Sequence, residues 1–294
     1  MIEPEMMERI THGQGFIAAL DQSGGSTPKA LKGYGIADDA WSNDDEMFEL
    51  IHQMRVRIIT SPAFTGDKVM GAILFEKTMD GMADGIPVPT LLLQRGVVPF
   101  IKVDKGLEAE ADGVQLMKPM VGLDELLARA KSLGMVGTKM RSVIHSADPK
   151  GIADIVAQQF EIGLHIAEAG LMPILEPEYS IKADNREEGE EILLKEILEH
   201  LHKLPENRVM LKLSLPVVPD RYMPLIEHRA VARVVALSGG YTRPEACALL
   251  AKNHGMIASF SRALLEDLRV GMSEEQFDAA LASAIDEIYR ASIT

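Results

Sequence analysis

The sequence predicts an α/β fold, a single (β/α)8 barrel that occupies residues 1–294 as one domain. Eight strand-length apolar runs alternate with longer stretches of helical period along the chain. Strands that are apolar on both faces and separated by helices form parallel sheets. Eight such units in a chain of 294 residues, with no low-complexity linker between them, fit a closed TIM barrel better than an open sheet.

The expected strands share short length and continuous apolar character, without helical period. They cover 16–20, 71–75, 98–103, 135–144, 171–176, 209–215, 231–237 and 256–260.

The expected helices place apolar residues three and four positions apart, as Met47, Ile51, Met54 and Ile58 show. The last helix also begins with a capping box, the pair Ser273 and Gln276. The expected helices cover 45–59, 123–132, 149–169, 187–204, 243–253, 261–268 and 273–291.

Composition excludes several functional classes. The chain has 44 acidic and 30 basic residues, a net charge of −14, which argues against nucleic-acid binding because that function needs a basic face. Its one cysteine, Cys247, excludes an internal disulfide and a cysteine-rich zinc site, and we interpret it as a small core residue. We see no secretory signal and no run as long as a membrane span, so we expect a cytoplasmic protein.

Lys212 is the most informative single residue, because it is the one cation in the apolar run MLKLSLP at 210–216. Burial disfavours the charged form of an amine, and a neutral amine attacks carbonyl carbons to form a Schiff base. The alternative interpretation is structural: an edge-strand lysine that extends its ammonium to the surface.

Other expected strands also carry polar residues at or near their C-terminal ends, where the active sites of such barrels lie. Ionisable groups in apolar strands are costly unless paired, so the pattern needs an explanation. A purely structural layer of ion pairs inside the barrel is the alternative to an active site. The residues are Asp21, Lys102, Asp104, Lys139, Arg141, Glu176, Glu178, Lys212, Ser214, Ser238, Ser259 and Arg262.

These residue types suit one kind of chemistry. Ser238-Gly239-Gly240 and Arg262 follow the seventh and eighth strands, the usual phosphate site of this fold; on its own, Gly-Gly is also common in turns. The cations on the third and fourth strands suit a second anionic group, and the carboxylates supply acid–base capacity beside the amine. A carbonyl compound that bears phosphate is the natural substrate for this set.

Eight motifs along the chain resemble, in their order, those of one known family. They are ALDQSGGSTPKAL (19–31), GAILFEKTM (71–79), IKVDKG (101–106), TKMRSVI (138–144), PILEPE (173–178), MLKLSLP (210–216), LSGG (237–240) and SFSRAL (259–264). Through them the chain resembles class I fructose-1,6-bisphosphate aldolase in its short bacterial form, and the resemblance covers most of the chain. The family cleaves fructose 1,6-bisphosphate reversibly to dihydroxyacetone phosphate and glyceraldehyde 3-phosphate, in glycolysis and gluconeogenesis.

The resemblance implies catalytic roles for four residues. Lys212 matches the Schiff-base lysine, and Glu176 matches the acid–base residue for imine formation and the C4-hydroxyl proton. Asp21 matches the aspartate that orients the lysine and the hydroxyls, and Lys139 matches the lysine beside those hydroxyls. The resemblance implies no metal and no cofactor, and a sugar phosphate as the small-molecule partner. The supporting substrate- and phosphate-binding residues are Lys102, Arg141, Glu178, Ser238, Gly239, Ser259 and Arg262.

The sequence departs from the family's pattern at two site positions. Gln22 stands where many relatives have glutamate, and Ser261 replaces a glycine next to the phosphate-binding arginine. The animal enzymes also end in a flexible tail with a functional tyrosine, but Tyr289 lies in a helical stretch here, so that role is not carried over.

Three alternatives to this reading stay open. A metal-dependent lyase is disfavoured because His200 and His202 are two apart in a helical pattern and do not face one another. Another Schiff-base sugar-phosphate aldolase, either transaldolase-like or with a preference for fructose 1-phosphate, would use the same groups. A non-catalytic interaction protein with this fold would have lost one of Lys212, Glu176 and Asp21. The sequence leaves the oligomeric state and the preferred ketose undecided.

Overall fold

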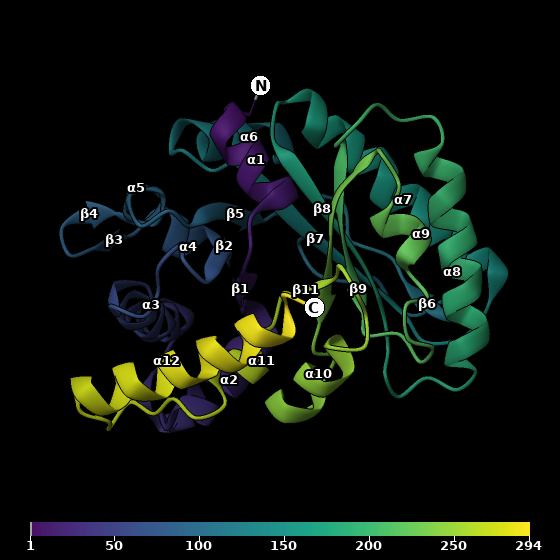
Figure 1. Cartoon of the computed structure of the whole chain (residues 1–294). Coiled ribbons are helices and arrows are strands. Elements are labelled where there is room, and N and C mark those ends of the chain that lie inside the picture. Colours follow the sequence, from purple (N-terminus) through teal and green to yellow (C-terminus); the bar gives the residue numbers. More distant parts are fainter. Residues whose placement is uncertain (1) are drawn as a thin grey trace.

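The computed structural model describes residues 2–294, whose main feature is a nine-stranded sheet rolled into a nearly closed barrel (Figure 1). Eight strands follow one another in chain order and pair in parallel. The backbone N–H of Ala19 donates to the carbonyl of Phe260 at 3.1 Å, which joins the first strand to the segment after the last. The expected (β/α)8 barrel is therefore confirmed. Its strands are β1 (Phe16–Leu20), β2 (Val69–Leu74), β5 (Val98–Lys102), β7 (Gly137–Ile144), β8 (Met172–Tyr179), β9 (Val209–Ser214), β10 (Val231–Leu237) and β11 (Ile257–Ala258).

The helices expected from the sequence are present, and most differ only slightly at their ends, but the helix expected at 261–268 covers only Arg262–Leu265. The capping box of Ser273 and Gln276 at the start of the last helix is confirmed. Figure 1 shows α7 and α8 on the outside of the strands and α12 across one side of the barrel. The helices are α3 (Asp44–Thr60), α6 (Leu123–Ser132), α7 (Pro149–Glu168), α8 (Arg186–Leu201), α10 (Arg243–Leu250), α11 (Arg262–Leu265) and α12 (Glu274–Ala291).

Several strand boundaries differ from expectation, and two of the differences affect where site residues lie. We expected the fifth strand to end at Glu176, but β8 continues through Pro177 to Tyr179 because it stays paired with β7 along its whole length. Glu176 and Glu178 therefore lie within the strand, and alternate strand residues share one face. The last strand, β11, is only Ile257–Ala258, so Ser259 lies just beyond it.

Ten elements were not expected, and all but one of them are eight residues long or shorter. Among them, α1 covers the N-terminal end of the barrel, where Ile10 is buried in the interior cluster. The guanidinium of Arg233 on β10 holds α1 in place by donating from Nε to the carbonyl of Ile10 at 2.9 Å. The unexpected elements are α1 (Pro4–His12), η1 (Gly24–Ser26), α2 (Thr27–Tyr34), η2 (Asp38–Ala40), α4 (Glu76–Met79), β3 (Met82–Ala83), β4 (Ile86–Pro87), α5 (Val88–Gln94), β6 (Val114–Gln115) and α9 (Met223–Ile226).

The barrel interior is apolar near α1 and charged at the opposite end. Phe100 and Ile174 belong to the buried interior cluster, and Gly137 makes room for the first of them. A β-carbon at Gly137 would lie 2.3 Å from the carbonyl oxygen of Met172 and 2.6 Å from the ring of Phe100. This apolar floor excludes water from beneath the charged layer, which strengthens the electrostatic interactions above it. Within residues 2–294 no helix is both long enough and apolar enough to cross a membrane.

Candidate active site

A cavity of about 980 Å³ opens at the C-terminal ends of the strands. Every site residue expected from the sequence lines it, although these residues come from seven strands or the segments just after them. They are Asp21, Lys102, Lys139, Arg141, Glu176, Glu178, Lys212, Ser238, Gly239, Ser259 and Arg262.

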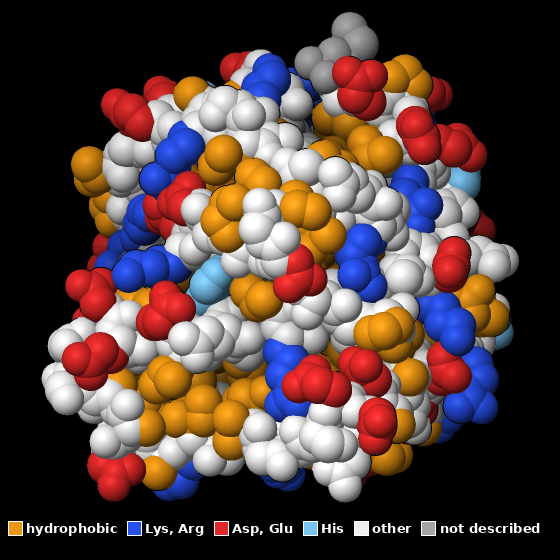
Figure 2. All heavy atoms as spheres, turned by 90° about the vertical axis from the view of Figure 1, so that its left-hand side faces the viewer, with side chains coloured by type: hydrophobic (Ala, Val, Ile, Leu, Met, Phe, Trp, Pro, Cys, Tyr) orange, Lys and Arg blue, Asp and Glu red, His pale blue; other side chains and the backbone are white. Residues whose placement is uncertain are grey.

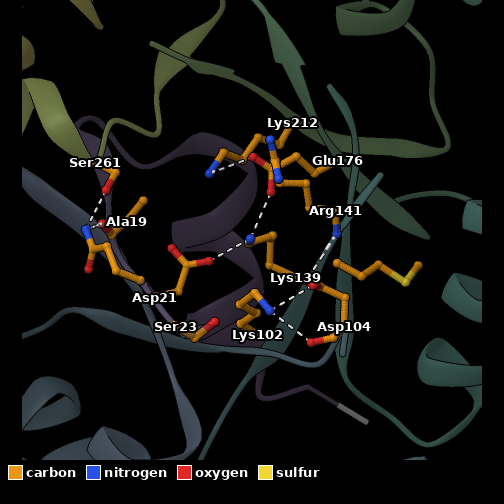
Figure 3. A network of polar contacts seen from close by, with 12 residues as sticks. Ala19, Asp21, Ser23, Lys102, Asp104, Lys139, Arg141, Glu176, Lys212 and Ser261 are labelled. Atoms are coloured by element: carbon orange, nitrogen blue, oxygen red, sulfur yellow. Dashed lines mark hydrogen bonds and ion pairs between the residues drawn. The ribbon is translucent and has the colours of Figure 1, made fainter. Parts of the chain in front are cut away.

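Four of these side chains form a buried chain of ion pairs at the centre of the cavity (Figure 3). Nζ of Lys139 lies 2.6 Å from Oδ2 of Asp21 and 2.9 Å from Oε2 of Glu176. The other carboxylate oxygen of Glu176 lies 3.2 Å from Nζ of Lys212. Lys139 thus bridges two carboxylates, whereas Lys212 contacts one, at a longer distance.

The charges of these four ion-paired side chains shift two pKa values in opposite directions. Burial alone would raise the pKa of the Asp21 carboxyl, but the cations of Lys139 and Lys212 outweigh burial and hold that pKa well below its usual range. Burial alone would lower the pKa of Lys139, but Asp21, Glu176 and Asp104 outweigh it and raise that pKa above the usual value for lysine. Lys139 therefore stays protonated at neutral pH.

The Asp21–Lys139 pair predicts a specific loss of stability in acid. A carboxyl whose pKa is lowered in the folded state stabilises it above the unfolded pKa of about 3.9, and this contribution is lost as the pH falls toward the folded pKa. We expect Asp21→Asn to have a lower free energy of unfolding than the unsubstituted protein at pH 7. The two free energies are expected to approach each other below about pH 4. Urea unfolding between pH 3 and 7 measures them, and a constant difference between the two proteins over this range would contradict the prediction.

The remaining cations of the charged layer are paired as well. Nζ of Lys102 lies 2.8 Å from Oδ1 of Asp104, and Nε of Arg141 donates to Oε2 of Glu178. Burial would lower the pKa of Arg141, but the Glu178 carboxylate outweighs it and raises that pKa. These cations were expected to receive a second anionic group, yet each already has a carboxylate partner, as the structural alternative also predicts.

The end of the cavity beside β10 and β11 has donors without partners. Among the described residues, nothing accepts a hydrogen bond from the buried Oγ of Ser259, and no side chain pairs with the guanidinium of Arg262. A β-carbon at Gly240 would lie 3.4 Å from Nη2 of Arg262, so the Ser238–Gly240 loop runs next to that guanidinium. Gly239 adopts a φ of +62°, which favours glycine. Unpaired donors around a cation make this end suitable for an anion.

Sequence reasoning missed one part of the cavity wall and a buried cation that contacts the lining residue Gln22. The cavity wall also includes Ser23 before η1, Ser26 of η1 and Lys29 of α2. All three lie in the motif at 19–31, but the sequence predicts a role there only for Asp21. Arg55 of α3 is fully buried, and burial lowers its pKa to about 10. Its place four residues after Ile51, on the apolar face of the helix, was the signal that could have found it.

Comparison with known proteins identifies the family. The family model for class I fructose-bisphosphate aldolase matches residues 5–216. The chain belongs to the class I fructose-bisphosphate aldolase family. Members of this family are lyases that act through a Schiff base without a metal, so this chain is a Schiff-base aldolase by family.

Solved structures agree on the fold. A fructose-bisphosphate aldolase from Plasmodium falciparum, solved with TRAP and a small-molecule inhibitor, has a TM-score of 0.81 and 20% identity, over 97% of this chain and 92% of that one. Cgl0159 from Corynebacterium glutamicum has a TM-score of 0.55 and 15% identity, over 98% and 92%. At these identities the likeness shows the barrel fold alone.

The family match covers the lysine strand but not the unpaired donors. It ends at residue 216, so the grouping of Ser238, Ser259 and Arg262 depends on the geometry of the cavity. In residues 2–294 no cluster of three or more His, Cys, Asp or Glu side chains is arranged to hold a metal ion.

Proposed function

We propose that this aldolase cleaves fructose 1,6-bisphosphate, with Lys212 as the Schiff-base lysine. The observation that carries the proposal is the position of Lys212. Its Nζ lies 3.2 Å from Oε1 of Glu176, inside a cavity whose one end has unpaired hydrogen-bond donors that suit a phosphate. Family membership supports the reaction type, and the cavity supports a phosphate-bearing ketose.

In the first step Lys212 forms the imine. Its ammonium gives up a proton to Glu176, and the neutral amine then adds to the C2 carbonyl carbon of the ketose. Glu176, now protonated, returns the proton to the carbinolamine oxygen, which leaves as water. The 3.2 Å distance between Nζ of Lys212 and Oε1 of Glu176 supports both proposed transfers, because it is within the reach of general acid–base catalysis.

In the second step the carbon–carbon bond breaks. The protonated imine withdraws the electron pair of the C3–C4 bond while Glu176 accepts the C4-hydroxyl proton, so the aldehyde leaves and an enamine stays on Lys212. Lys139 and Asp21, ion-paired at 2.6 Å, orient the hydroxyls. Protonation of the enamine at C3 and addition of water to the imine then release dihydroxyacetone phosphate.

The phosphates occupy opposite ends of the cavity in this proposal. The C1 phosphate binds at Ser238, Gly239, Ser259 and Arg262, where donors lack partners. The C6 phosphate lies toward Lys29, an exposed lysine of α2 with no ion-pair partner among the described residues. Lys102 and Arg141, both paired with carboxylates, support that end.

One assay tests the proposed function directly. Cleavage of fructose 1,6-bisphosphate is expected to proceed fully in the presence of a chelator, since the iminium does the work of a metal cation. Borohydride added with substrate is expected to leave a stable adduct on Lys212, identified by peptide mass spectrometry. Loss of activity in chelator, or an adduct on another lysine, would contradict the mechanism.

A preference for fructose 1-phosphate is the second candidate. The pairing of Lys102 and Arg141 with Asp104 and Glu178 favours it, because a second phosphate must compete with these carboxylates. A transaldolase-like Schiff-base aldolase would use the same lysine on a different acceptor. The ratio of kcat/KM for the bisphosphate and the 1-phosphate decides between the two ketoses.

The cellular setting and the assembly are also proposals. We propose a cytoplasmic enzyme of glycolysis and gluconeogenesis, since sugar phosphates are its substrate class. Figure 2 shows clusters of apolar atoms between charged side chains on one face, and Met82 of β3 is 52% exposed. A homo-oligomer would cover such atoms, and sedimentation velocity measures its size.

A further inference from the structure

Gln22 and Ser261, the two site positions expected to differ from the family's pattern, contact each other. Gln22, just after β1, donates from Nε2 to Oγ of Ser261, which precedes α11 and lies 239 positions away in sequence. The same amide nitrogen lies 3.3 Å from the carbonyl oxygen of Ala19. Figure 3 shows Ala19 and Ser261 on the side of Asp21 away from Lys139. The contact bridges the seam where β1 meets β11.

Arg55 fixes the orientation of the Gln22 side chain. Its Nη2 donates to the backbone carbonyl of Gln22 and lies 3.4 Å from the side-chain Oε1, while its Nη1 donates to Oγ1 of Thr78 at 2.9 Å. Arginine has only donors, so the Gln22 atom that faces it is the oxygen. The amide nitrogen must then face Ser261.

This orientation determines the role of the Ser261 hydroxyl. An amide nitrogen can only donate, so Oγ of Ser261 accepts from Gln22 and keeps its own proton free. Among the described residues, nothing accepts that proton. Ser261 lines the cavity next to Arg262, so the free O–H belongs to the group of unpaired donors that includes Ser259.

We propose that Ser261, held by Gln22 and Arg55, donates a hydrogen bond to the phosphate that Arg262 binds. Ser261 is then a binding residue for a phosphate monoester dianion, and Gln22 is a positioning residue. The identity of the ligand rests on the proposed function. The hydrogen bond to the dianion is charge-assisted and therefore stronger than a neutral one.

A carboxylate at position 22 would reverse this arrangement. It would pair with the buried guanidinium of Arg55 and could only accept, so the Ser261 proton would point to it instead of the ligand. It would also add a negative charge beside Asp21. Gln22→Glu is therefore expected to weaken phosphate binding more than Gln22→Ala does.

Binding of inorganic phosphate to the full chain tests the proposal without any chemistry. At constant ionic strength, titration calorimetry is expected to show about tenfold weaker binding for Ser261→Ala, and retained binding for Ser261→Thr, which keeps the hydroxyl. Gln22→Ala is expected to weaken binding about threefold. In the Ser261→Ala background the same Gln22→Ala change is expected to have no further effect.

Two surface variants are matched controls. Ser132→Ala and Gln53→Ala each remove a side chain whose hydrogen bond is exposed, and both should bind phosphate like the unsubstituted protein. The melting temperature of each variant checks that it folds. If Ser261→Ala or Gln22→Ala binds normally, if their effects add, or if the unsubstituted protein binds no phosphate, the proposal is wrong.

The outcome is separable from that of the proposed function. If Gln22 and Ser261 have coupled effects on phosphate binding but borohydride traps no adduct on Lys212, the proposed function is wrong and this inference stands. Trapping on Lys212 together with unchanged phosphate binding in Ser261→Ala would overturn this inference alone.

Discussion

Lys212→Arg is expected to reduce ketose-phosphate cleavage by about 10⁵-fold or more, the scale at which loss of a covalent nucleophile acts. Arginine stays protonated at all accessible pH values and cannot form the carbinolamine. It keeps the positive charge that pairs with Glu176 at 3.2 Å, so the fold and the charge balance of the cluster are retained. Steady-state cleavage and borohydride trapping are the two measurements.

The structure gives a reason to propose Lys212, and not Lys139, as the nucleophile. Lys139 contacts two carboxylates at 2.6 and 2.9 Å, and its pKa is raised, so it is rarely neutral. Lys212 contacts one carboxylate at a longer distance. If Lys212→Arg still forms a borohydride adduct, the assignment fails and Lys139 becomes the candidate.

Two further variants make this experiment decisive. Lys203→Arg, an exposed lysine outside the cavity, is the matched control and should behave like the unsubstituted enzyme. Lys212→Met removes the charge as well as the nucleophile. It should be as inactive as Lys212→Arg, but less stable, because nothing at position 212 then balances the charge of Glu176. Equal stability of the two inactive variants would show that the charge of Lys212 does not support the fold.

The barrel could be predicted from the sequence because its long elements repeat one pattern. Strands such as β9 and helices such as α7 are long enough to show their period. The short α1 could not be predicted, since its role is to cover the floor of the barrel, and the burial of Ile10 depends on strands far along the chain. The extent of β8 through Pro177 likewise depends on its pairing with β7.

Eleven residues that line the cavity could be predicted, but not how their side chains pair with one another. The residue types at the strand ends predict which residues belong to the site, whereas the sheet register and the side-chain conformations determine which of them contact one another. Arg141 is in register with Glu176, yet its guanidinium pairs with Glu178. The contact of Gln22 with Ser261 depends on the closure of the barrel, which no local pattern contains.

Lys139→Met tests whether the buried ion pairs serve catalysis, stability or both. Without the ammonium, Asp21 and Glu176 would be two buried carboxylates without the cation that bridges them. Removing one partner from a buried ion-pair network typically costs about 3–5 kcal/mol of unfolding free energy. Activity is expected to fall about 10²- to 10⁴-fold, as for loss of a group that positions the reacting protons.

The double variant Lys139→Met with Asp21→Asn separates the two roles. Removing both charges leaves no unpaired carboxylate at Asp21, so most of the lost stability is expected to return, because replacing a buried pair by neutral groups is often close to neutral in free energy. Activity is expected to stay low, since neither hydroxyl-orienting group remains. Urea unfolding and steady-state cleavage on the same preparations measure the two effects. Recovery of activity together with stability would mean that the Asp21–Lys139 pair is only structural, and that Glu176 and Lys212 carry the chemistry without it.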